Sequence, residues 1–157
     1  MRVLKLFLVI LVIGVLTAGA IILLPKLEKN GGQAAPPSSG EASGIVISEV
    51  MSSNKGVYPD NNGNSSDWVE IHNTTEQDID LASCALSDDE TNPAKWPFPS
   101  AVLKARGYLV IFLSGKSSYN MEQGYIHCSF KLSSKGEKLI LTGAAGKVLD
   151  TVNVPAL

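Results

Sequence analysis

The sequence predicts an all-β fold, a sandwich or barrel of seven or eight short strands, preceded by an apolar N-terminal segment and a linker. Two observations carry this prediction. From Ile45 onward, short runs alternate between apolar and polar residues with a period of two, and clusters of turn-forming residues separate them. No window in that part has the 3.6-residue periodicity of an amphipathic helix.

The N-terminal segment, residues 1–24, is predicted to be a transmembrane signal anchor. The stretch Leu6–Leu24 contains no charged residue, and as a helix it would extend about 28 Å, close to the roughly 30 Å of a bilayer core. Arg2 and Lys5 precede it, which predicts a cytoplasmic N-terminus and a remainder exported across the cell membrane. The alternative is a cleaved signal peptide, since Ala18–Ala20 has the small residues of a cleavage site.

Residues 25–44 are predicted to be a flexible linker, and residues 45–157 a single domain. The linker contains Gly31-Gly32, Pro36-Pro37 and Ser38-Ser39-Gly40 among scattered apolar residues. Such a segment cannot bury enough surface to offset the entropy of ordering it. We therefore expect the linker to hold the domain near the membrane while letting it reorient.

The first half of the domain is predicted to contain three strands and one long loop. The strands Ile45–Val50 and Trp68–His72 alternate clearly, and Met51–Ser66 between them is rich in Asn, Asp and Gly, which favour turns. After a turn at Asn73–Gln77, a third strand is expected over Ile79–Leu86.

The second half is predicted to begin with an irregular edge. Prolines around Lys95–Phe98 lack the N–H that a ladder needs, so this segment is an edge strand or an extended crossover. The nearly continuous apolar run Tyr108–Leu113 is typical of a central strand buried on both faces. A polar loop is expected at Ser114–Gly124, and further strands at Tyr125–Leu132, Lys138–Leu141 and Val148–Val152.

The charge pattern argues against nucleic-acid binding. After Gly44 the chain has 9 basic and 13 acidic residues, a net charge of −4. Ten of these acids and one base lie between Glu49 and Glu90. Binding to nucleic acid would require a clustered basic face, and the few lysines near Lys131 are too few to form one.

The acidic half suggests a calcium site as one of two alternatives. Asp60, Asn62, Asn64 and Asp67 offer carboxylate and amide oxygens on a flexible loop, and calcium binds six to eight such oxygens. The loop lacks the full Asp-x-Asp-x-Asp-Gly signature. The other alternative is that Asn and Asp serve only the backbone conformation of turns. Apart from this candidate calcium, no cofactor is expected.

Cys84 and Cys128 are the only cysteines, and both are predicted to lie outside the cytoplasm. An even number there permits one disulfide, Cys84–Cys128. Each alternates with apolar neighbours, so the other alternative is two buried free thiols that act as small hydrophobic side chains.

No catalytic arrangement is apparent. His72 and His127 fall on predicted strands, and no Gly-x-Ser-x-Gly elbow or phosphate-binding loop occurs. A binding surface is better supported. Alternation places Trp68 and Glu70 on one face of their strand, where Trp68 could lie at a surface groove near Tyr58. Exposed aromatic rings beside acids suit a protein or cell-envelope polymer as partner, so Tyr58, Trp68 and Glu70 are the candidate contacts.

The order of several separated motifs resembles the lamin tail domain family, in particular its exported bacterial branch. The resemblance covers Ile45 to about Val154 and includes IVISEVMSSN, DWVEIHN, DIDLASCALSDD, KWPFP, GYLVIFLSG, HCSFKLSSKGEKLILT and GKVLDTV. It implies an immunoglobulin-like β-sandwich without a catalytic site. Cys84 departs from the family pattern, because a large aromatic residue is common there.

Two functions follow as expectations. The first is a membrane-tethered module outside the cell that binds or adheres to a protein or envelope polymer. The second is a structural spacer, with or without bound calcium, that presents a downstream domain. Bacterial relatives often continue beyond the position of Leu157, so the chain is either a minimal anchored module or the front of a longer protein.

Overall fold

The computed structural model describes residues 43–157, and the predicted anchor and nearly all of the linker lie outside the described residues. Within residues 43–157, no helix is long and apolar enough to cross a membrane. The helical elements there are two short 3₁₀ turns, η1 (Leu81–Ser83) and η2 (Ala144–Gly146). The remainder consists of strands and loops, which confirms the predicted all-β class.

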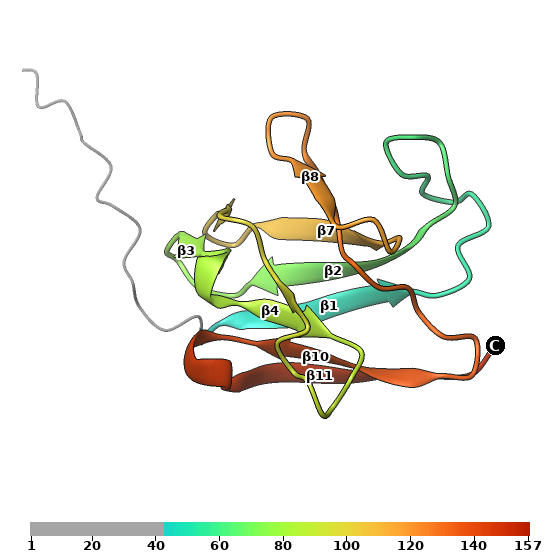
Figure 1. The fold of residues 1–157 in the computed structure, drawn as a ribbon. Helices are drawn as coiled ribbons and strands as arrows, with labels where there is room; N and C mark the ends of the chain where they lie inside the picture. The colour runs from blue at the N-terminus through green and yellow to red at the C-terminus, as the bar shows by residue number, and fades with distance from the viewer. Residues whose placement is uncertain (1–42) are drawn as a thin grey trace, which may run out of the picture. The chain divides into compact units, whose positions relative to one another are not determined.

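The strands assemble into two main sheets and one small pair. Their bounds are β1 (Ile45–Met51), β2 (Asp67–Asn73), β3 (Ile79–Asp80), β4 (Ala85–Ser87), β5 (Trp96–Pro97), β6 (Val102–Leu103), β7 (Tyr108–Leu113), β8 (Ser118–Asn120), β9 (Tyr125–His127), β10 (Glu137–Thr142) and β11 (Val148–Val154). One sheet has the order β1-β2-β7-β9-β8 and the other β11-β10-β4-β5, while β3 pairs with β6 (Figure 1).

The core lies between the two sheets, and the inner faces of β1 and β2 alternate as their sequences predict. Val69 of β2 is in register with Ile111 of β7, and Ile47 of β1 with Ile71 of β2. These side chains are buried, and most residues of the core come from similar alternating positions on the two sheets. The largest fully buried apolar residues are Ile45, Ile71, Leu81, Leu86, Ile111, Leu113, Ile126, Leu139, Leu141 and Val69.

Two of the predicted strands are shorter than expected. Ile79–Leu86 is not one strand, because η1 interrupts it after β3. The carboxylate of Asp80 accepts a hydrogen bond from the N–H of Ala82 at 2.9 Å, and this local bond turns the chain into η1. The second prediction, Tyr125–Leu132, is confirmed over Tyr125–His127 alone, where β9 pairs with β8 and β7.

The predicted positions of β5 and β7 are confirmed. The proline-rich strand β5 forms an edge of its sheet, and β7 is the central strand of the other. Burial on both faces of β7 holds only for Ile111–Leu113, since Tyr108 at the other end is 60% exposed.

Basic residues from the second half of the domain pair with much of the acidic half. Four ion pairs join positions that are 7 to 48 residues apart. Because the partners are exposed or half-buried, each contributes little to stability, but together they neutralise much of the acidic surface. The pairs are Arg106–Glu76, Lys104–Asp78, Lys95–Asp88 and Lys138–Glu90.

Candidate functional site

The long loop between β1 and β2 has a fixed shape although it contains no strand or helix. Its organiser is Asn54, whose side chain is buried. The Asn54 amide donates to the carbonyls of Tyr58 at 2.7 Å and Ser66 at 2.9 Å, and its oxygen accepts from the N–H groups of Gly56 and Val57. The Asn54 side chain thereby satisfies backbone N–H and C=O groups of the loop that a neighbouring strand would satisfy in a sheet.

A second polar residue, Asp60, closes the tip of this loop. Its carboxylate accepts hydrogen bonds from the N–H groups of Asn62 and Asn64, both at 2.9 Å, and from the hydroxyl of Ser66 at 2.9 Å. Gly63 provides the left-handed conformation that this turn requires, with φ of +77°. Burial alone would raise the pKa of Asp60, but these hydrogen bonds outweigh it and lower the pKa to about 2.

The loop folds over one end of the outer face of the five-stranded sheet, the face that carries Trp68 and Glu70. The Tyr58 ring packs against Trp68 edge-on and against Phe112 in a stacked arrangement, each with centroids 5.9 Å apart. Trp68 is therefore only 8% exposed, and the predicted surface groove at Trp68 is wrong because Tyr58 covers it. Tyr58 itself is 49% exposed, while half-buried Glu70 accepts the Ser48 hydroxyl at 2.7 Å.

The loop is joined to the sheet through His127 at the end of β9. Its Nδ1 lies 2.9 Å from the Ser114 hydroxyl and its Nε2 lies 2.6 Å from Oδ1 of Asn61. Because an amide oxygen only accepts, Nε2 carries the proton and Nδ1 accepts from Ser114. Burial lowers the pKa of His127; the negative charge of Asp60 opposes this shift and the positive charge of Lys116 reinforces it. The imidazole is thus neutral at pH 7.

A hydroxyl that donates to a histidine raises the question of nucleophilic catalysis. Ser114 is buried, however, and two of the N–H groups that follow it, which an oxyanion would need, already donate to carbonyls. The N–H of Gly115 donates to the carbonyl of Phe130, and that of Ser117 donates to Cys128. The hydrogen bonds of His127 therefore serve to dock the loop on the sheet.

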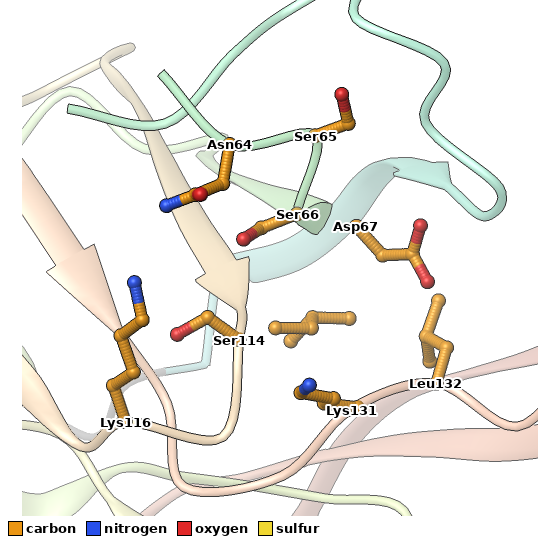
Figure 2. A pocket seen from close by; sticks show the side chains of 9 residues that line it. Asn64, Ser65, Ser66, Asp67, Ser114, Lys116, Lys131 and Leu132 are labelled. Atoms are coloured by element: carbon orange, nitrogen blue, oxygen red, sulfur yellow. The ribbon is translucent and has the colours of Figure 1, made fainter. Parts of the chain in front are cut away.

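A pocket of about 400 Å³ opens beside the docked loop. Figure 2 shows the loop residues Asn64, Ser65 and Ser66 on one side and two lysines on the other. The lining consists of Asn64, Ser65, Ser66, Asp67, Leu113, Ser114, Lys116, Lys131 and Leu132. Ser114, Lys116 and Lys131 are not predictable as site residues from the sequence, because local patterns do not reveal which loops meet. In the structure Gly115 lies close to Lys131, since a Cβ added at Gly115 would lie 3.4 Å from the Lys131 side chain.

The structure brings part of the predicted calcium set together. Asp60 and Asn64 share hydrogen bonds through their side chains, but Asn62 reaches Asp60 through its backbone N–H. Asp67 lies apart and accepts the N–H of Asn54 at 3.1 Å. Within residues 43–157, no group of three His, Cys, Asp or Glu residues could hold a metal ion. Calcium binding stays a prediction, which a calorimetric titration with millimolar Ca²⁺ tests.

The two cysteines are buried free thiols in the structure, the second of the two alternatives that the sequence left open. Burial raises the pKa of Cys84 to about 11 and that of Cys128 to about 12. The Cys128 thiol donates to the carbonyl of Phe130 at 3.3 Å, so it is held within the core.

A comparison with known protein families gives a match to nearly all of the described domain. The family model described as Lamin Tail Domain matches residues 38–156, which is most of the chain. No curated protein matches the chain.

Proposed function

Because this chain belongs to the lamin tail domain family, we propose that it is a membrane-tethered binding module whose immunoglobulin-like domain works outside the cell. Membership in the family indicates a non-catalytic binding or structural role. The tether, the location and the assignment to the exported bacterial branch are our inference from the N-terminal sequence.

The N-terminal sequence supports a tether of the signal-anchor type. The stretch Leu6–Leu24 is long enough to cross a bilayer and carries no charge, while Arg2 and Lys5 lie on its N-terminal side. The segment up to Gly44 would then act as a spacer between membrane and domain.

The observation that carries the binding role is the presentation of Tyr58. About half of this ring is exposed, yet Trp68 and Phe112 hold it in place from below. On the same outer face, Tyr108 is 60% exposed and stacks on His72 with centroids 4.1 Å apart. Rings that are fixed before binding lose little conformational entropy on contact, which favours recognition of a partner. A protein or a cell-envelope polymer suits such a surface.

A retention experiment tests the binding role. The full chain in lipid nanodiscs is immobilised and exposed to a cell-envelope extract. We expect a component retained by the wild type to be lost with Tyr58→Ala/Tyr108→Ala. Tyr119→Ala is the matched control, because Tyr119 is equally exposed but is in register with the buried Ile126 and so lies on the opposite face. Equal retention by all three chains would favour the spacer role instead.

A second experiment tests the tether and the orientation. Intact cells that express the full chain are treated with protease, and their membranes are then extracted with carbonate. The domain is expected to be digested from outside and the untreated chain to remain in the membrane fraction. Release of the chain into the carbonate extract, or protection of the domain in intact cells, would contradict the proposal.

A further inference from the structure

The pocket beside the docked loop holds two cationic side chains, Lys116 and Lys131. Among the described residues, Lys131 makes no ion pair, whereas Lys116 lies 3.9 Å from Asp60. The Asp60 carboxylate is already occupied by the hydrogen bonds that close the loop tip. Two lysines therefore line the same pocket, and of the two only Lys116 has an acid within ion-pair distance among the described residues.

Other residues of the pocket lining offer hydrogen-bond acceptors. The hydroxyls of Ser66 and Ser114 donate to Asp60 and His127, which leaves the oxygen lone pairs of both serines to accept. Asp67 uses one carboxylate oxygen for the N–H of Asn54, and its other oxygen has no partner among the described residues. In Figure 2, Lys116 extends toward Asn64 and Ser66, while Asp67 lies on the far side of the pocket.

The lysines and the hydrogen-bond acceptors of the pocket lining together favour a particular class of ligand. The lysines favour one anionic group, whereas Asp67 and the serines favour hydroxyl hydrogens and disfavour a doubly charged phosphate. Half-buried Leu132 adds apolar surface for the face of a ring. The volume of about 400 Å³ is within the range of small-molecule sites. We propose that this pocket binds a hexuronic acid, with its carboxylate at the lysines and its hydroxyls at Asp67.

This site is separate from the aromatic surface at Tyr58, so it goes beyond the proposed function and does not depend on membrane tethering. The same chemistry occurs in a free sugar and in a residue of an acidic polysaccharide. Glucuronate and a short oligogalacturonate distinguish these sources. If the pocket accepts a residue of a polymer, it should bind the oligomer at least as tightly as it binds glucuronate.

Calorimetric titration of the full chain in lipid nanodiscs tests the proposal. We expect glucuronate to bind and both glucose and inorganic phosphate to bind at least about tenfold more weakly. Lys116→Met and Lys131→Met keep the aliphatic stem but remove the charge, and each should weaken glucuronate binding about tenfold. Lys135→Met is the matched control, since Lys135 is exposed outside the pocket lining.

The outcomes separate this proposal from the function proposed above. Tyr58→Ala should bind glucuronate as the wild type does, even if it loses the envelope partner. Equal affinity for glucose or phosphate, no heat with millimolar glucuronate, or unchanged affinity in both lysine variants would each overturn the assignment. The lysine variants carry surface substitutions, and their unfolding midpoints verify that the fold is intact.

Discussion

Nε2 of His127 lies 2.6 Å from Oδ1 of Asn61, although 66 positions separate these residues in the chain. This contact joins the tip of the long loop to the end of β9, and it orients the imidazole so that the ring also accepts from Ser114. The loop that covers Trp68 and lines the pocket is thus fixed to the sheet by a part-buried hydrogen bond.

Loss of this contact should destabilise the domain. Asn61→Ala leaves the buried N–H of His127 without its acceptor, which costs about 1–3 kcal/mol. Denaturation in urea, followed by tryptophan fluorescence, measures the change. Asn62→Ala is the matched control, because Asn62 is exposed like Asn61 and its side chain donates to Oδ1 of Asn61 at 3.4 Å rather than bonding to His127. A loss no larger than that of the control would show that the contact does not hold the loop.

Stability should fall as the pH drops below neutral. The pKa of His127 is lowered in the folded domain, so the unfolded chain takes up the proton first as the pH falls through about 6.5. The stabilisation is complete above this pH and is lost below it. Urea denaturation between about pH 7 and pH 5 should show a smaller slope in His127→Gln. His72→Gln controls for the loss of an imidazole, and identical slopes in wild type and His127→Gln would refute the assignment.

Asp60 should contribute a second, more acidic transition. Its folded pKa of about 2 lies below the ordinary value of 3.8, so the ionised carboxylate stabilises the fold above about pH 4. This contribution, about 2 kcal/mol, should disappear as the pH falls toward 2. Asp60→Asn should lose it already at pH 7, with unfolding at several pH values as the measurement. A variant with wild-type stability at pH 7 would contradict this role.

The two tryptophans should respond differently to replacement by phenylalanine. Both are buried, but Nε1 of Trp96 donates to the Ser117 hydroxyl at 3.3 Å, whereas Nε1 of Trp68 has no partner among the described residues. Trp96→Phe removes a hydrogen bond, and Trp68→Phe removes an unsatisfied donor. Trp96→Phe should therefore be less stable than Trp68→Phe by about 1 kcal/mol in equilibrium unfolding. The reverse order would show that packing volume dominates.

Thiol reactivity should report the state of the cysteines. Burial and the raised pKa values of Cys84 and Cys128 leave little thiolate at neutral pH, so the native chain should scarcely react with Ellman's reagent. Both thiols should titrate after denaturation without reductant. If they titrate only after reduction, the chain contains the disulfide instead.

Alternation in the sequence was sufficient to locate most of the sheet. The inner positions Val69 and Ile71 are buried as their period of two predicts, and the prolines correctly placed β5 at an edge. The expected strand was wrong at Leu81–Ser83, where the Asp80 side chain caps a 3₁₀ turn, although Leu81 itself is buried. The spacing of the hydrophobic residues carries no information about such a local hydrogen bond.

Sequence by itself determined the all-β class, the face that each main strand buries and the family to which the domain belongs. Only the tertiary structure decided that Tyr58 covers Trp68 and that Asn61 reaches His127. It also decided that Lys116 and Lys131 line the same pocket. The physical reason is that burial has a period along the chain, whereas hydrogen bonds between distant loops have none. These contacts exist only once the sheets have brought the loops together.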